Sequence, residues 1–195
     1  MILTINHNGS KLEADLSRPH DISIPVQRKN SVGSFGIKGA EYADYRDGDF
    51  IGNKNLGGPC NLETITFTPH GNSTHTECLG HIALTQHFVN ECIDDNYHVA
   101  KLITLEPVGS EKEANLDFSK VDFTELKNFE ALVIRTLPNA ETRVNKDYSG
   151  KNAHFIKPKD MQQIVDSGIQ HLVIDLPSVD PEWDGGALAA HHVYW

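Results

Sequence analysis

The sequence predicts an α/β fold in a single domain spanning residues 1–195, and three observations support this prediction. The run EALVIRTL at 130–137 is apolar enough for a strand that is buried on both faces. Residues 157–168, KPKDMQQIVDSG, place their apolar side chains at helical spacing. The run QHLVIDLPSVDP follows this helix after a short glycine link, an arrangement typical of α/β proteins.

The N-terminal third of the chain indicates strands separated by a long loop. Residues 1–16 alternate apolar and polar side chains around Asn8-Gly9, which is the strongest short-range signal for a β-hairpin. Residues 17–59 are rich in Pro, Gly, Asn and Asp, so we expect a long loop with one or two short strands. The run NLETITFTP at 61–69 alternates imperfectly and predicts a strand that leads into a histidine-rich segment.

The helix at 157–168 carries signals for both of its ends. Pro158 stands near its start, where a missing backbone N–H costs nothing, and Gly168 is placed to end it. The strand that follows is closed by a turn containing Pro177. We interpret Asp175 and Asp180 as shaping this turn rather than as catalytic groups.

Composition favours a small-molecule partner. The 17 basic and 27 acidic residues give a net charge of -10, which repels a phosphate backbone and argues against nucleic-acid binding. No apolar run is long enough to cross a bilayer, and the first residues lack the features of a signal peptide, so we expect no membrane association and a cytoplasmic location.

The three cysteines lack C-x-x-C spacing and are expected to be reduced thiols, with Cys60 and Cys92 as small buried hydrophobic residues.

The segment PHGNSTHTECLGH at 69–81 concentrates side chains that bind metals or carry protons. In an extended chain His75 and Glu77 share one face about 7 Å apart, close enough to hold one ion. In a helix the same two side chains would point about 200° apart. His81 would lie about 20 Å from His75 in a straight strand. It can therefore reach the same site only if the chain bends, which Gly80 would permit.

These constraints assign roles to four residues. We expect His75 and Glu77 to be metal ligands, His70 to be a ligand brought round by a turn at 71–72, and His81 to be the acid/base across the site. A chance cluster is the alternative, since the chain has eleven histidines. Cys78 as a nucleophile has less support, because an extended chain turns it away from both neighbouring histidines. A serine hydrolase mechanism has even less support, because the motif G-x-S-x-G is absent from the sequence.

The acidic run and five other histidines are interpreted as structural or surface features rather than as parts of the site. The acidic run Glu111 to Glu113 is expected to be a solvated face. Five further histidines are expected to lie on the surface or to have structural roles: His20, His87, His98, His154 and His171.

Residues 70–81 resemble the signature H-x-G-T-H-x-D-x-P-x-H of the metal-dependent cyclase and kynurenine formamidase-like hydrolases. Thr74, His75 and His81 match in register, Glu77 stands at the aspartate, and His70 lies one residue further upstream than the first histidine. Ser73 and Leu79 replace the glycine and the proline of the signature. Three other segments resemble the family in its order: EADLSRPHDISIPV, ALVIRTL and LVIDLPSVDP with the later AAHH.

The resemblance implies a mixed, barrel-like sheet flanked by helices, of the swivelling β/β/α type, usually assembled as homodimers or larger homo-oligomers. It implies that His191 is a late metal ligand, with His192 as the alternative, and that the cofactor is Zn²⁺, with Mn²⁺ as the alternative. The family carries a further glutamate ligand beyond this histidine, and the sequence stops at Trp195. We therefore expect a chain shortened at its C-terminus or an incomplete second site, and one or two ions per chain.

The resemblance also implies the activity. It indicates a metal-dependent hydrolase of a small amide or lactone, of the arylformamidase and cyclase type that acts on carbon–nitrogen bonds, with His81 as general acid/base. The alternative is a degenerate, non-catalytic member that binds a metal or a small ligand. Glu77 in place of aspartate, the position of His70 and the missing glutamate favour this alternative.

Overall fold

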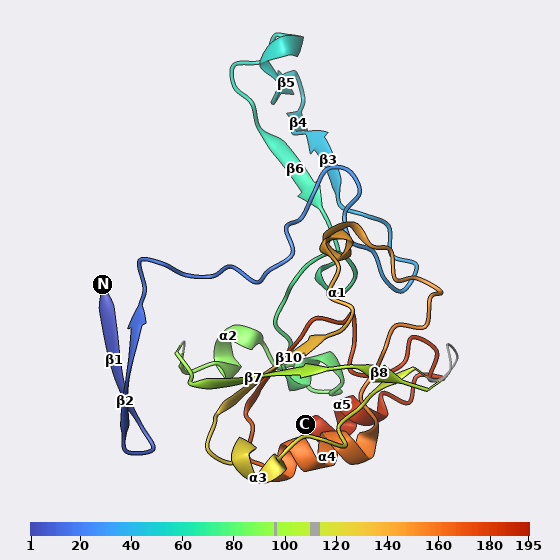
Figure 1. The fold of residues 1–195 in the computed structure, drawn as a ribbon. Helices are drawn as coiled ribbons and strands as arrows, with labels where there is room; N and C mark the ends of the chain where they lie inside the picture. The colour runs from blue at the N-terminus through green and yellow to red at the C-terminus, as the bar shows by residue number, and fades with distance from the viewer. Residues whose placement is uncertain (96, 110–113) are drawn as a thin grey trace. The chain divides into compact units, whose positions relative to one another are not determined.

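The computed structural model describes residues 1–95, 97–109 and 114–195, and the chain divides into two compact units (Figure 1). Unit 1 comprises Met1–Ile22, Thr76–Ala140 and Asn152–Trp195, and unit 2 comprises Ser23–His75 and Glu141–Lys151. The acidic run at 111–113 lies outside the described residues.

Unit 1 is built on a three-stranded parallel sheet. Its strands are β7 (Ala100–Leu105), β10 (Ala131–Thr136) and β11 (His171–Ile174), in the order β11-β10-β7. The strand predicted at 130–137 is confirmed as the central and most buried one. The strand predicted after the helix is confirmed as β11, but it is only partly buried because it forms the edge of the sheet among the described strands.

The predicted helix is confirmed as α4 (Pro158–Asp166), with Pro158 in its first turn and Gly168 beyond its end in a left-handed conformation at φ +83°. Glycine adopts this conformation without the steric cost that a Cβ would add. Three short helices complete unit 1: α2 (Val89–Cys92), α3 (Phe123–Leu126) and α5 (Ala189–Tyr194). Within unit 1, Figure 1 draws α3, α4 and α5 below β7 and β10.

One face of the parallel sheet forms the core of unit 1. Leu132 and Ile134 of β10 are 0% and 1% exposed, and the fully buried Met161 of α4 belongs to the same cluster. The opposite face is less covered, since Leu102 remains 55% exposed. Apolar burial against the helices therefore stabilises one side of the sheet.

Unit 1 also carries two hairpins. The predicted N-terminal hairpin is confirmed as β1 (Ile2–His7) paired with β2 (Ser10–Asp15). Asn8 and Gly9 form its turn at φ 48° and 76°, as the Asn-Gly signal requires. The second hairpin pairs β8 (Pro107–Val108) with β9 (Asn115–Leu116).

Unit 2 is a set of short antiparallel strands and turns. The predicted strand at 61–69 is confirmed as β6 (Glu63–Thr66), which pairs with β3 (Glu41–Asp44), while β4 (Arg46–Asp47) pairs with β5 (Phe50–Ile51). The region 17–59 thus holds three short strands rather than one or two. The unit also contains a short helix and two 3-10 turns: α1 (Pro69–Asn72), η1 (Lys54–Leu56) and η3 (Glu141–Asn145).

The α/β class is confirmed, because a parallel sheet and antiparallel hairpins occur with helices in one chain. The described strands do not close into a barrel, so the barrel-like sheet that the family resemblance implies stays a prediction. Within the described part of the chain, no helix is long and apolar enough to cross a membrane.

Candidate metal centre

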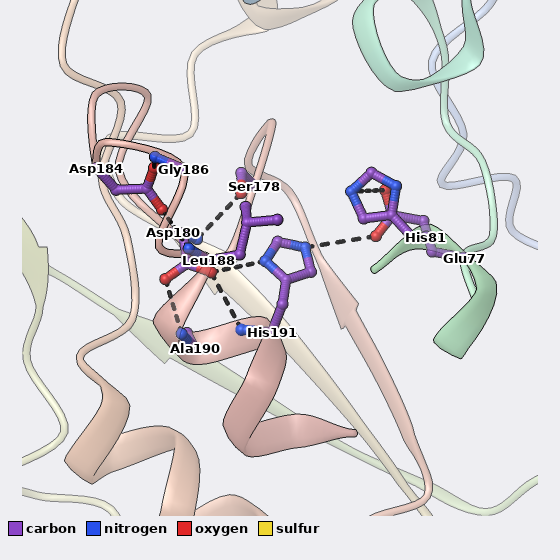
Figure 2. Close-up of polar contacts among 9 residues, drawn as sticks. All are labelled: Glu77, His81, Ser178, Asp180, Asp184, Gly186, Leu188, Ala190 and His191. Atoms are coloured by element: carbon purple, nitrogen blue, oxygen red, sulfur yellow. Dashed lines mark hydrogen bonds and ion pairs between the residues drawn. The ribbon is translucent and has the colours of Figure 1, made fainter. Parts of the chain in front are cut away.

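Two imidazole side chains of unit 1 converge on the carboxylate of Glu77. Its Oε2 lies 3.6 Å from Nε2 of His191, and its Oε1 lies 3.9 Å from Nε2 of His81 (Figure 2). One ligand atom from each residue lies within 4.8 Å of the other two. The carboxylate therefore stands between two imidazoles, an arrangement that can hold a divalent ion.

A bend between Glu77 and His81 creates this geometry. Cys78 precedes a 3-10 turn, η2 (Leu79–His81), which carries His81 back toward Glu77 instead of along a straight strand. Gly80 allows the bend, because a Cβ at this position would lie 2.2 Å from the backbone oxygen of His87. The bend expected at Gly80 is present, and it brings His81 to Glu77.

His191 enters the cluster from helix α5 and is 6% exposed, whereas the neighbouring His192 is exposed. The loop before α5 is held by Asp184, which accepts hydrogen bonds from the backbone N–H groups of Gly186 at 2.7 Å and Leu188 at 2.6 Å. Of the two adjacent histidines, the structure therefore brings His191 to Glu77.

Asp180 positions His191. Its buried carboxylate accepts hydrogen bonds from the backbone N–H groups of Ala190 at 2.8 Å and His191 at 3.1 Å, at the start of α5. It also accepts the Nδ1 proton of the His191 ring at 2.6 Å, which turns Nε2 toward Glu77 (Figure 2). A carboxylate in this role fixes the tautomer and orientation of a ligating histidine.

The interpretation of Asp180 as a turn-shaping residue was thus incomplete. The sequence offers no local signal for its contact with His191, which lies eleven residues further along the chain. Asp175 fits the turn-shaping interpretation better. Its carboxylate accepts a hydrogen bond from the backbone N–H of Thr136 at 3.0 Å and so links the ends of β10 and β11.

The two acidic groups around His191 determine its protonation. Burial disfavours the charged ring, but the hydrogen bonds to Asp180 and Glu77 outweigh it and raise the pKa of His191 to about 9. Burial opposes ionisation of Asp180 as well, yet its bonds to His191 and to α5 lower its pKa. In the metal-free protein His191 is therefore protonated at neutral pH, and an ion that binds its Nε2 has to displace this proton.

The other two predicted ligands, His70 and His75, lie in unit 2. His70 is part of α1, and its ring centroid is 4.6 Å from that of His75. Nδ1 of His75 donates a hydrogen bond to the backbone oxygen of Ser73 at 2.9 Å, which leaves the lone pair of the neutral ring on Nε2. The structure thus brings the two rings together, while their assignment as metal ligands stays a prediction.

The cysteine expectations need correction. Cys60 and Cys92 are exposed rather than buried, because the short segments that carry them lie at the surface. The Cys78 thiol donates to the backbone oxygen of His87 at 3.5 Å, a contact that gives it no histidine base. The nucleophile alternative for Cys78 therefore gains no support.

Several other histidines make structural contacts, as expected. The ring centroids of His98 and His171 lie 3.9 Å apart with the rings tilted by 32°, and Nδ1 of His98 lies 3.3 Å from a carboxylate oxygen of Glu130. A ring nitrogen of His87 hydrogen-bonds the hydroxyl of Thr85 at 2.9 Å.

The donor set of the cluster fits a divalent metal. Imidazole nitrogens with a carboxylate oxygen suit Zn²⁺ and Mn²⁺, and the buried Asp180 accepts the hydrogen bond by which a ligating histidine is held in place.

In comparisons with known proteins, a family model described as "Putative cyclase" matches residues 14–181, which includes Glu77, His81 and Asp180. No curated protein matches the chain.

Proposed function

Because the chain belongs to the Cyclase family, we propose that it is a metal-dependent hydrolase that acts on the carbon–nitrogen bond of a small amide or on a lactone. The observation that carries this proposal is the convergence of His81 and His191 on Glu77, with His191 oriented by the buried Asp180. A carboxylate that accepts the other ring N–H is the arrangement by which proteins orient a ligating histidine, and Asp180 occupies this position.

We propose Glu77 and His191 as ligands, with His70 and His75 as the further ligands that the family signature implies. His75 precedes Glu77 by two residues, so the peptide chain limits their Cα separation to about 7 Å. Zn²⁺ is the expected ion and Mn²⁺ the alternative, with one or two ions per chain. We also expect a homodimer or larger homo-oligomer, which light scattering would measure.

When bound, a divalent ion polarises a substrate carbonyl and makes a nearby water molecule more acidic. His81 Nε2 then takes a proton from the attacking water and returns it to the leaving nitrogen, or to the ring oxygen of a lactone. A positioned acid/base of this kind contributes about 100- to 10,000-fold to the rate. Glu77, 3.9 Å from His81 Nε2, stabilises the imidazolium that forms between the two transfers.

The assay for this function uses protein purified without chelator. Hydrolysis of N-formyl aryl amides, isatin and simple lactones is measured with and without added Zn²⁺ or Mn²⁺. His81→Ala should keep its bound metal and lose turnover, because the residue moves protons. Equal loss of metal in His81→Ala and His191→Ala would instead make His81 a ligand and refute the division of roles.

A second function, binding of a metal or small ligand without turnover, is favoured by Glu77 at the position of the family aspartate. The extra methylene shifts a carboxylate by about 1 Å, and displacements of this size cost about 100-fold in rate. Stoichiometric metal with no hydrolysis of any of these substrates would support the binding protein. Glu77→Asp should then gain activity if the carboxylate position is the cause.

A further inference from the structure

A tryptophan packs against the candidate ligand His191. Trp195 caps the C-terminal end of α5, and its backbone N–H donates a hydrogen bond to the backbone oxygen of His191 at 3.1 Å. Side chains four residues apart on a helix lie on the same face. The indole of Trp195 accordingly lies beside the imidazole of His191, with 5.6 Å between the ring centroids. Trp195 therefore contacts the side chain that the metal centre needs in a fixed orientation.

The polar contacts of His191 hold its ring only at the edge. Asp180 accepts the Nδ1 proton at 2.6 Å, and a carboxylate oxygen of Glu77 lies 3.6 Å from Nε2. A hydrogen bond tolerates a deviation of about 30° from a straight line before it weakens strongly. A metal ligand has to point its nitrogen more accurately than this, because the ion has a preferred coordination geometry. Close packing against a neighbouring ring supplies the additional restraint.

Two aromatic rings pack against the His191 ring. The centroid of His81 lies 5.4 Å away and that of Trp195 lies 5.6 Å away, and both distances are in the range of aromatic contacts. His81 is the proposed proton carrier, so its charge changes during turnover. The indole of Trp195 has one N–H donor and no acceptor nitrogen, so it moves no proton and acts on His191 by packing.

Trp195 is itself held in place by Tyr194. The two rings meet edge to face, with 6.0 Å between the centroids and an angle of 68° between the planes. The Tyr194 hydroxyl donates a hydrogen bond at 2.9 Å to the backbone oxygen of Gln170, the residue before β11. A series of contacts thus leads from the edge of the parallel sheet through Tyr194 and Trp195 to His191.

We propose that Trp195 is a positioning residue of the metal centre and holds the His191 ring in the orientation that points Nε2 at Glu77. This role rests on the proposed function, because that function needs an ion on His191. Removal of the indole leaves Asp180 and Glu77 in place, so metal binding should weaken rather than disappear. Groups that support a ligating histidine contribute about 10- to 100-fold to metal affinity, and we expect about 10-fold for Trp195.

The affinity of the whole protein for Mn²⁺ is measured by isothermal titration calorimetry at pH 8. Trp195→Ala should bind about 10-fold more weakly than wild type. Trp195→Phe keeps an aromatic ring beside the imidazole and should recover most of the affinity. Trp183→Ala is the matched control, because it removes a tryptophan that is 78% exposed in the loop before α5, and it should bind like wild type.

A second control separates positioning from a general loss of stability. Tyr194→Phe removes the hydrogen bond to Gln170 but keeps the ring that packs on Trp195. It should lower the stability of the protein to urea and leave the Mn²⁺ affinity unchanged. If Trp195 only stabilises the fold, Tyr194→Phe should instead weaken Mn²⁺ binding as Trp195→Ala does, in proportion to the stability that each variant loses.

Fluorescence tests the contact between Trp195 and the metal centre. The chain has two tryptophans, so all tryptophan emission of Trp183→Phe comes from Trp195. Co²⁺ binds imidazole and carboxylate ligands and quenches a nearby indole through its unfilled d shell, whereas Zn²⁺ has a filled one. Co²⁺ should quench Trp183→Phe in a saturable titration, and added Zn²⁺ should reverse the quenching. The double variant with His191→Ala should show no saturable quenching at the same concentrations.

The outcomes distinguish the role of Trp195 from the metal centre itself. Equal Mn²⁺ affinity of wild type and Trp195→Ala would overturn the positioning role and leave the metal centre intact. Unchanged emission of Trp183→Phe that calorimetry shows to be loaded with Co²⁺ would overturn it as well. Wild type that binds neither Mn²⁺ nor Co²⁺ would refute the metal centre, and the role of Trp195 with it.

Discussion

The contact between Asp180 and His191 makes the stability of the metal-free protein depend on pH in a defined direction. The pKa of His191 is raised from 6.5 to about 9 by its acidic partners. A raised histidine pKa contributes stability that is fully present below about pH 6.5 and is lost as the pH rises through 9. The shift corresponds to about 3 kcal/mol.

Asp180→Asn should remove most of this contribution. The aspartate accepts three hydrogen bonds, from Ala190 N, His191 N and His191 Nδ1. An asparagine has one acceptor oxygen, so in either orientation at least one of these donors faces an NH₂ group. Breaking one partner of a buried ion pair costs about 3 to 5 kcal/mol, and Glu77 still faces His191, so we expect about 3 kcal/mol at pH 6.5.

The assay is urea denaturation with a chelator present, at pH 6.5 and 9.5. The free energy of unfolding of the wild type should fall between these two pH values by more than that of Asp180→Asn. Asp184→Asn is the matched control, because Asp184 holds the same loop through Gly186 and Leu188 without contacting His191. It should lose about 1 kcal/mol at both pH values. The same pH dependence in Asp180→Asn and wild type would refute the reasoning.

Three further predictions concern the scaffold. Leu132→Ala, at a fully buried position, should lower the free energy of unfolding by about 2 to 5 kcal/mol in urea. Gly168→Ala, at φ +83°, should cost about 1 to 2 kcal/mol because a Cβ is strained there; a neutral result would contradict the left-handed end of α4. Burial and the nearby His98 lower the pKa of His171, so its contribution to stability is lost as the pH falls below about 6.5. His171→Gln should therefore lose less stability than wild type between pH 7 and 5, measured by the same denaturation.

Features coded by adjacent residues were predictable from the sequence. Asn8-Gly9 specifies a two-residue turn whatever surrounds it, and Pro158 with Gly168 marks both ends of α4. The run at 131–136 is apolar enough to be recognised as the central strand. Strand β7 was not predicted, because its sequence AKLITL does not alternate apolar and polar side chains regularly. The parallel order β11-β10-β7 joins segments far apart in the sequence, and no local pattern encodes it.

The candidate site likewise contains residues that a local sequence pattern predicts and residues whose role depends on distant segments. His75, Glu77 and His81 were found because they are crowded into one short segment, and Gly80 indicated where that segment could bend. The sequence indicates only a turn-shaping role for Asp180, because its contact with His191 depends on where α5 begins.

The central claim is that Glu77 and His191 bind a divalent ion, and the metal content of the protein tests it most directly. Wild type, His191→Ala and His192→Ala are purified without chelator, loaded with Zn²⁺ or Mn²⁺ at pH 8, desalted and measured by elemental analysis. Wild type and His192→Ala, in which the replaced histidine is an exposed one, should each hold at least one ion per chain, and His191→Ala should show a clear loss of metal. Wild type without stoichiometric metal, or equal metal in all three proteins, would contradict the central claim.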